Sequence, residues 1–291
     1  MNVHGVAMSE PYYTVNQSTD ERRKDGSFNI RSSHNKAKLI LLMNDGQRKR
    51  LLDLGSGKGG DEGKWQSLCY HEVFALDIDV HGLRELESRH KKSQGRGRRT
   101  RGRSPPPLQV HTVCADMSEK LDAFIPHDYF DMAAAMFSIH FVCGSEAQAD
   151  NGSESPGLSG TVRNVANSLR AGGMFVGITL DAAKLSDDVM TFHTQDGDQF
   201  ARFRAYPGKR KVEVLIRSIS EHPRWEYLVD FEHLEACLHE QGMRFATQEE
   251  AVKLGLGSAC GSLLNIAPTG RLCDEERRYT DMYRYWVAKK P

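Results

Sequence analysis

The chain has 291 residues, a formal net charge of zero at pH 7 and a hydrophobic content of 39%. These values predict a globular protein with one large domain, and they argue against a protein that coats nucleic acid over its whole surface. The sequence contains no run of about 18 apolar residues and no basic-then-apolar leader, so we expect neither a membrane span nor a secretory signal. The six cysteines form no C-x-x-C pair, so we expect no metal site, no disulfide framework and a reducing compartment.

Short apolar runs alternate with segments of helical periodicity along the chain. We expect helices at 35–43, 61–69, 80–89, 161–169 and 231–239, and strands at 50–54, 72–77, 108–115, 129–136 and 174–179. This alternation predicts an α/β fold with a doubly wound, mostly parallel sheet. Near the C-terminus we expect the start of a strand at 244–246 and a closing edge strand at 282–287.

Several segments lie outside this alternation. Residues 1–30 are predicted to be an N-terminal extension, and residues 147–160 a polar loop. Residues 91–107 are rich in Arg, Gly, Ser and Pro, a composition that predicts a basic loop of the disordered type. That loop is either a solvated insertion or an arm that contacts RNA or directs nuclear import. Residues 185–224 predict an insertion in the C-terminal half, with an antiparallel strand at 211–219.

A glycine-rich turn follows the first expected strand. Gly55, Gly57 and Gly60 match the pattern G-x-G-x-x-G, in which the missing Cβ lets the backbone approach a nucleotide-like ligand closely. The turn does not match a phosphate-binding P-loop, because the spacing from Gly57 to Gly63 is one residue too long. In addition, Trp65 stands where such a loop has Ser or Thr.

Acidic residues close the first three expected strands. Asp53 lies inside the first strand, Asp77 ends the second, and Asp116 follows the third with Met117 beside it. A carboxylate at position 53 would repel a pyrophosphate but could face an ammonium group, while Asp77 could accept two ribose hydroxyls. The pattern therefore favours S-adenosylmethionine over NAD as the ligand. Each aspartate taken alone could instead cap a helix or a turn.

Longer motifs resemble one family. The stretch Asp53–Asp61 with Lys64-Trp65 resembles D-L-G-C-G-K-G-G-D-L-x-K-W of the mRNA cap (guanine-N7) methyltransferases of eukaryotes and their viruses. Arg31–Lys38 resembles their R-N-F-N-N-W-x-K, and Phe130–Phe141 resembles F-D-x-x-x-x-Q-F-x-x-H-Y. Residues 169–181, 225–229 and 282–283 also find counterparts. The resemblance implies a class I S-adenosylmethionine-dependent methyltransferase domain over residues 31–291, in which 185–224 would be a cap-side insertion.

The resemblance also assigns site residues. Those that fall where the family contacts S-adenosylmethionine are Lys38, Gly55, Asp77, Asp116, Met136 and Phe141, to which the strand-end argument adds Asp53, Gly57 and Met117. Those that fall at the cap are His34, Asn35, Lys58, Lys64, Arg89, His140, Glu226 and Tyr283. The chain departs from the family pattern with His34 for asparagine, Ser56 for cysteine, Met136 for glutamine, Phe141 for tyrosine and Leu180 for proline.

The implied reaction is methyl transfer from S-adenosylmethionine to N7 of the guanosine cap of mRNA. Because guanine N7 already carries an exposed lone pair, proximity and orientation suffice and no general base is needed. The Glu226 carboxylate could accept from N1–H and the exocyclic amine of guanine. Lys58, Lys64 and Arg89 could face the triphosphate, although Lys64 and Arg89 could equally be solvated helix residues and His140 a buried structural histidine. Glu226 could also simply begin a helix.

Other functions compete with this one. The chain could methylate another RNA atom or a small metabolite, or it could be a non-catalytic cap-binding or activator subunit with the same fold. The expected partners are the capped 5′ end of RNA and, as a weaker expectation, other capping enzymes such as a guanylyltransferase or a triphosphatase. A nuclear location fits the reaction, with a cytoplasmic setting as the alternative.

Overall fold

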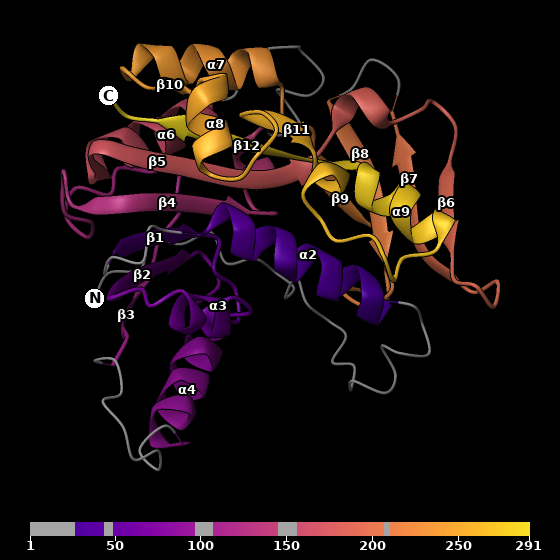
Figure 1. The fold of residues 1–291 in the computed structure, drawn as a ribbon, viewed down its shortest axis with the longest axis horizontal. Helices are drawn as coiled ribbons and strands as arrows, with labels where there is room; N and C mark the ends of the chain where they lie inside the picture. The colour runs from indigo at the N-terminus through magenta and orange to yellow at the C-terminus, as the bar shows by residue number, and fades with distance from the viewer. Residues whose placement is uncertain (1–26, 44–48, 97–106, 145–155, 207–209) are drawn as a thin grey trace.

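Most of the chain forms a central sheet with helices on both faces (Figure 1). The computed structural model describes residues 27–43, 49–96, 107–144, 156–206 and 210–291. The sheet has the order β10 (Arg244–Phe245), β12 (Tyr283–Lys289), β5 (Leu169–Leu180), β4 (Phe130–Met136), β1 (Arg50–Leu54), β2 (Glu72–Asp77) and β3 (Gln109–Cys114). β1 to β5 are parallel, whereas β12 runs antiparallel to β5. The predicted doubly wound, mostly parallel sheet is therefore confirmed.

The two faces of the sheet carry separate cores. Leu52 and Leu54 point toward α6 (Pro156–Ser168) and α7 (Phe231–Glu240). Leu51 points the other way, into a core that includes α2 (Ser27–Leu41), α3 (Glu62–Ser67) and α4 (Val80–Arg96). Because successive strand residues face opposite sides, this alternation also turns Asp53 toward the face that carries α2.

A second, smaller sheet lies beside the first (Figure 1). It is antiparallel, with the order β6 (Met190–His193), β7 (Gln199–Ala205), β8 (Lys211–Ile216) and β9 (Arg224–Tyr227). Its apolar face packs on α9 (Asp274–Asp281), where the rings of Phe192 and Phe203 lie 5.4 Å and 5.8 Å from that of Tyr279. This sheet occupies most of the predicted insertion and continues a few residues beyond it.

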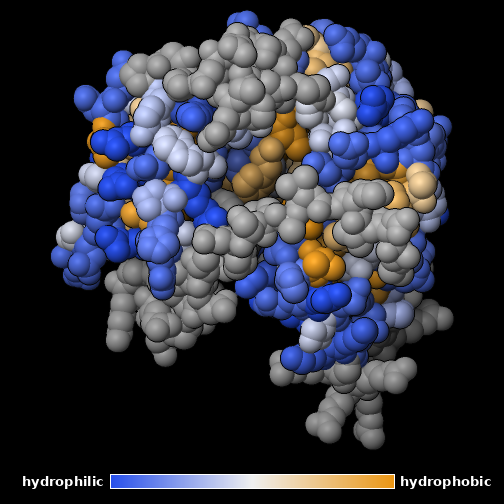
Figure 2. Space-filling model, turned by 180° about the vertical axis from the view of Figure 1, so that it is seen from behind, coloured by the Kyte–Doolittle hydropathy of each residue, from blue (hydrophilic) through white to orange (hydrophobic). Residues whose placement is uncertain are grey.

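The remaining described elements are short. They are α8 (Gln248–Lys253), β11 (Cys260–Ser262), which pairs with β12, and the 3-10 helices η2 (Ile139–Val142), η3 (Ala182–Lys184) and η4 (Leu263–Asn265). Seen from the opposite side, the surface is mainly hydrophilic, with apolar residues gathered in a central hollow (Figure 2).

Several predicted boundaries were wrong. α2 begins at Ser27 rather than 35, and Ile30 of its first turn packs into the core. α6 begins at Pro156, inside the predicted polar loop. β8 ends at Ile216 rather than 219. β12 is not an edge strand, since both β10 and β11 pair with it.

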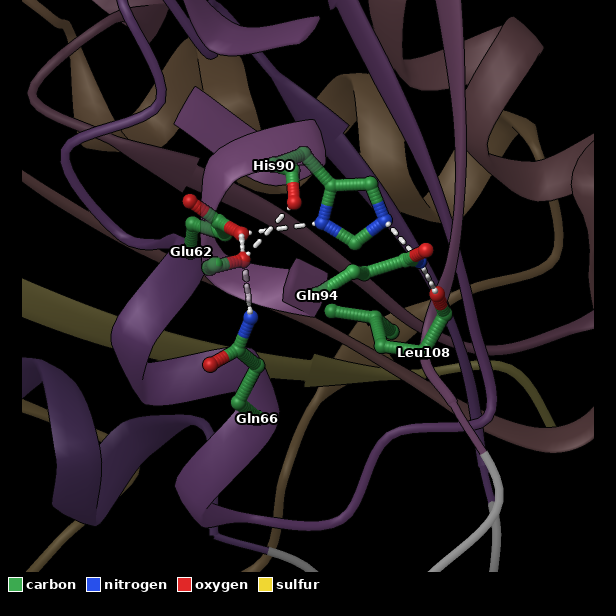
Figure 3. Close-up of polar contacts among 6 residues, drawn as sticks. Glu62, Gln66, His90, Gln94 and Leu108 are labelled. Carbon is green, nitrogen blue, oxygen red and sulfur yellow. Dashed lines mark hydrogen bonds and ion pairs between the residues drawn. The ribbon is translucent and has the colours of Figure 1, made fainter. Parts of the chain in front are cut away.

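The predicted basic loop also begins too early, because residues 91–96 continue α4. A polar network centred on the buried side chains of Glu62 and His90 explains the extension (Figure 3). Glu62 Oε1 accepts hydrogen bonds from Ser93 Oγ at 2.7 Å and Gln66 Nε2 at 3.0 Å, and it pairs with His90 Nδ1 at 2.9 Å. Gln94 Nε2 lies 2.8 Å from His90 Nε2 and donates to the Leu108 carbonyl. The spacing of apolar residues in the sequence does not reveal such polar contacts, so it did not predict this part of the helix. Residues 97–106 of the predicted loop lie outside the described residues.

The glycine turn gives a stability prediction. Gly55 has φ +76°, and a Cβ there would lie 2.3 Å from Ser138 Cβ. Gly55→Ala should therefore lower the free energy of unfolding by about 2–4 kcal/mol, through left-handed strain and overpacking. Gly60→Ala is the matched control, because a Cβ at Gly60 meets nothing within 4 Å. Denaturant unfolding of both variants is the measurement, and equal effects would contradict the steric argument.

Candidate functional site: a glycine turn beside an aromatic cavity

The glycine turn lies at the carboxyl end of β1, next to β4, where the strand order of the sheet reverses. Ligands of open α/β sheets bind at this position. Gly55, Gly57 and Gly59 all have positive φ, at 76°, 51° and 71°. The amides of Gly55 and Ser56 both donate to the Leu76 carbonyl. The turn is thus fixed by backbone bonds to the end of β2, and its conformation requires glycine.

Asp77, at the end of β2, is tied directly to this turn. Its Oδ2 accepts from the Gly57 amide at 2.7 Å, and its Oδ1 accepts from the Asp79 amide at 2.8 Å. Burial raises the pKa of the Asp77 carboxyl, although these backbone bonds oppose the shift. Each oxygen keeps a further lone pair, so the carboxylate can accept from hydroxyls of a ligand lying on the turn.

Asp53 is buried just before the turn, with 4% of its surface exposed. Burial raises the pKa of its carboxyl to about 7, and repulsion from Asp61 adds to the shift. A cation placed beside Asp53 would favour its ionised form and lower this pKa.

An ion-pair cluster joins the turn to α2. Asp61 pairs with Lys38 at 2.8 Å and with Lys64 at 2.6 Å. Burial alone would raise the pKa of Asp61, but the two lysines outweigh burial and lower it to about 2. Asp61 therefore stays ionised and holds Lys38 against the end of the glycine turn.

Asp116 and Met117 lie on the far side of the turn. Asp116 Oδ1 accepts from the amide and the hydroxyl of Ser118, so this aspartate also caps its own turn. Met117 is buried, and its Cε lies 3.7 Å from the position of a Cβ at Gly55. The structure thus brings the predicted strand-end residues around one turn.

A cavity of about 150 Å³ opens beside this turn, between α2, β4, β9 and α9. It is lined by His34, Lys38, Met136, Phe137, His140, Leu180, Ile216, Ile219, Glu226, Tyr279 and Tyr283. Six of the predicted site residues therefore share one cavity although they come from distant parts of the sequence. Lys38 belongs both to this cavity and to the ion-pair cluster, so the two halves of the site meet at its side chain.

His34 is part of an aromatic stack in the cavity wall. Its ring lies between Phe137 at 5.6 Å and Tyr279 at 6.0 Å, nearly parallel to both, and its Nε2 lies 3.2 Å from Thr280 Oγ1. Burial, with a smaller contribution from Lys38, lowers the pKa of His34 to about 3. The ring is therefore neutral near pH 7 and contributes an aromatic surface rather than a charge.

The polar end of the cavity consists of His140 and Glu226. Both are buried, and His140 Nε2 lies 3.6 Å from Glu226 Oε2, too far for a good hydrogen bond. Burial lowers the pKa of His140, while Glu226 opposes the shift. Among the described residues, His140 Nε2 has no hydrogen-bond partner. A buried polar atom of this kind at a cavity wall is suited to bind the polar edge of a ligand.

Three other predicted cap residues and Phe141, which was predicted to contact S-adenosylmethionine, lie outside this cavity. Lys58, in the glycine turn, pairs with Glu85 of α4 at 3.4 Å, and Arg89 of α4 pairs with the same carboxylate at 2.5 Å. Both lie outside the cavity lining. Lys64 is held by Asp61. Phe141 has 44% of its surface exposed and packs on His140 outside the lining.

Asn35 lines a neighbouring cavity of about 180 Å³, which shares His34 and Lys38 with the first. Glu226 is on strand β9 and does not begin a helix.

The structure adds residues that sequence reasoning missed. Phe137 adopts φ +64° and presents its ring to His34, Tyr283 and Lys38. The Tyr279 hydroxyl lies 2.9 Å from that of Tyr283. Tyr279 lies on α9 and Tyr283 begins strand β12, so no helical spacing rule links them and nothing in the sequence singles out Tyr279. Phe137 lies inside a quoted motif, but the sequence carries no signal for its positive φ.

A family model for the mRNA (guanine-N(7))-methyltransferase domain matches residues 4–254. The chain belongs to this family. It is 28% identical to mRNA cap guanine-N(7) methyltransferase 1 of Oryza sativa over 243 residues, 78% of this chain and 61% of that protein. It is 28% identical to the mRNA cap guanine-N(7) methyltransferase of Caenorhabditis elegans, over 65% of this chain and 48% of that protein. It is 25% identical to that of Candida albicans, over 77% of this chain and 54% of that protein. The chain thus spans 48–61% of the length of these relatives.

Solved structures confirm the fold. The CcbJ methyltransferase from Streptomyces caelestis has a TM-score of 0.56 at 13% identity, covering 89% of each chain. An S-adenosylmethionine-dependent methyltransferase from Clostridium acetobutylicum has a TM-score of 0.55 at 15% identity, covering 93% of this chain and 98% of that one. The class I methyltransferase fold of this family member is therefore shown.

The described residues form neither a metal site nor a membrane-spanning helix. No group of three or more His, Cys, Asp or Glu side chains there is arranged to hold a metal ion. None of the helices described is both long and apolar enough to cross a membrane.

The low pKa of His34 predicts a pH-dependent stability difference. Between pH 6.5 and about 4 the unfolded chain protonates this histidine and the folded chain does not, so acid destabilises the wild type. In His34→Asn this loss should disappear, and the variant should gain about 1.4 kcal/mol per pH unit relative to the wild type. Unfolding of both proteins across this range measures the difference. Asp53, with its raised pKa, changes the free energy of unfolding with pH in the opposite direction, but it does so equally in both proteins. A stability difference between the two proteins that does not vary with pH would contradict the low pKa of His34.

The raised pKa of Asp53 predicts pH-dependent binding of a cationic ligand. Below pH 7, Asp53 must lose a proton when the ammonium group binds, so affinity for S-adenosylhomocysteine should fall on acidification by up to about tenfold per pH unit. Calorimetry between pH 5.5 and 7.5 measures this slope. Asp53→Asn should bind with little pH dependence, and an unchanged slope in that variant would contradict the role given to Asp53.

Proposed function

We propose that this protein transfers a methyl group from S-adenosylmethionine to N7 of the guanosine cap of RNA. The proposal is supported above all by one cavity, which is lined by Glu226, His140, Tyr283 and Lys38; Lys38 in turn pairs with Asp61 at the end of the glycine turn. One half of the site suits the donor and the other half suits a purine, and the two halves adjoin.

The chain's own residues fit the donor. The glycine turn follows β1 with positive φ at Gly55 and Gly57, the Asp77 carboxylate lies on the turn, and buried Asp53 lies beside it for an ammonium group. Asp116 and Met117 flank the turn where an adenine would be read. S-adenosylmethionine, when bound there, supplies the electrophilic methyl group.

The chain's residues also fit guanine. Glu226 can accept from N1–H and the exocyclic amine, a pair of donors that adenine does not present on one edge. His140 Nε2 is buried without a partner among the described residues and can bind the remaining polar edge. The neutral His34 ring with Phe137 and Tyr279 provides flat apolar walls for a purine. The cavity residues need only orient N7 and exclude water, since N7 attacks through its own lone pair.

The triphosphate and the partners belong to the same proposal. Lys58 and Arg89 would provide positive charge near the 5′–5′ triphosphate after leaving Glu85. Lys64 would add positive charge from its position beside Asp61, while Asn35 would extend the cap site. Association with other capping enzymes and a nuclear location are proposed on the reaction alone. Residues 31–291 form the proposed methyltransferase unit, with the 185–224 region on its cap side.

Substrate competition tests the reaction. Capped GpppRNA, ApppRNA and uncapped RNA are each incubated with labelled S-adenosylmethionine, and label should appear on GpppRNA alone. Equal labelling of all three would favour methylation of another RNA atom. Labelling of a small metabolite alone would favour the metabolite alternative, and tight donor or cap binding without transfer would favour a non-catalytic subunit.

Two variants should separate the halves of the site. Asp77→Ala should weaken donor binding by about 1.5–3 kcal/mol, because charge-assisted hydrogen bonds to the ribose are lost. Glu226→Ala should leave donor affinity unchanged and lower cap methylation. Calorimetry with S-adenosylhomocysteine and the methylation assay report the two effects, and thermal melting verifies that both variants fold. Equal loss of donor binding in both variants would refute this division.

A further inference from the structure

Strand β9 has two faces with different chemistry. Glu226 is buried at the cavity, whereas its neighbour Trp225 has 45% of its surface exposed. Successive strand residues point to opposite faces, so Trp225 lies on the side of the small sheet away from the cavity. We call this side the outer sheet face, and define it by Arg202, Arg204, Lys211, Glu213 and Trp225. The pairing of the strands places Arg204, Glu213 and Trp225 in one row across β7, β8 and β9.

The exposed indole is held in place by its neighbours. The Tyr206 ring meets the Trp225 ring edge-on at 4.7 Å, and Lys211 Nζ lies 5.1 Å from the Trp225 ring centroid. The lysine lies within the range of a cation–π contact. A single exposed hydrophobic residue would need no explanation, but an exposed indole in contact with a tyrosine and a lysine forms an aromatic platform with a positive charge beside it.

The charges on the outer sheet face are mostly positive. It carries three basic residues and one acidic residue, and the acidic one, Glu213, is paired with Arg202 at 3.0 Å. Arg204 is exposed next to that pair. Leu215, the aliphatic residue opposite Arg202, is buried. A protein partner would call for a larger exposed apolar surface, whereas aromatic residues beside basic ones suit the bases and phosphates of a single-stranded nucleic acid.

We propose that the outer sheet face binds single-stranded RNA downstream of the cap. A base would stack on Trp225, and phosphates would lie near Lys211 and Arg204. This inference rests on the proposed function, which supplies RNA as the substrate. It adds a second contact site, formed by the reverse side of the strand that carries Glu226. That site would favour capped transcripts over a free cap without reading their sequence.

The experiment compares substrates of two lengths. Michaelis constants are measured for the GpppG dinucleotide and for a capped RNA of about ten nucleotides, a length that single-strand sites commonly cover. In the wild type, the longer substrate should have the lower Michaelis constant. Trp225→Ala should raise the constant for the long substrate by about 5- to 20-fold, as expected for one lost stacking contact, and leave that for GpppG unchanged. Trp225→Phe should retain most of the effect, because phenylalanine can still stack.

Two further variants sharpen the comparison. Lys211→Gln should reduce the slope of log affinity for the long RNA against log salt by about 0.7, as expected for one lost phosphate contact on a single strand. Phe124→Ala is the matched control, since Phe124 is an aromatic residue with 59% of its surface exposed outside the outer sheet face, and it should change neither constant.

Distinct outcomes would overturn the inference. If Trp225→Ala leaves the constant for the long RNA unchanged, no RNA binds there, and the face would be free for a protein partner. If it raises both constants equally, Trp225 acts through the cavity instead. Fluorescence anisotropy with an uncapped RNA of the same length tests the face without any methylation, so failure of the reaction and failure of this contact are distinguished.

Discussion

The ion pair between Lys38 and Asp61 is the contact on which the site depends. Asp61 follows the glycine turn and holds Lys38 of α2 through one carboxylate oxygen and Lys64 of α3 through the other. Lys38 in turn lines the aromatic cavity and lies 5.3 Å over the Phe137 ring. Because Asp61 stays ionised when buried between two cations, this pair fixes the distance between the part of the site suited to a donor and the part suited to a purine.

Both sheets contribute residues to the lining of the cavity. The parallel sheet supplies Met136 and Leu180, while the antiparallel sheet supplies Glu226 and Ile216. Helix α2 crosses between the two sheets (Figure 1) and provides His34. Neither sheet alone would enclose a nucleobase, so the insertion after β5 is a wall of the proposed active site rather than a surface addition.

The electrostatics of the cavity suit the proposed transfer of a methyl group from a sulfonium to a neutral nitrogen. His34 and His140 are both held neutral by burial. The positive charge of Lys38 is balanced by Asp61. An enclosed site with flat apolar walls and few fixed cations disperses the developing charge without competing water. The departure from the family pattern at His34 is accommodated because the ring stacks between two aromatic residues.

The sequence by itself determined the parallel strands, the glycine turn and the aspartates at the ends of β1 and β2, as well as the family to which they belong. These features follow from short-range rules, since strand period, turn glycines and motif spacing act within a few residues. Only the tertiary structure decided that Phe137 and Tyr279 enclose His34, that α4 continues to Arg96 through the bonds of Glu62 and His90, and that Lys58 and Arg89 pair with Glu85. Such contacts join side chains that are distant in the sequence. Their geometry depends on how helices and strands pack against one another, so it cannot be predicted from local sequence patterns.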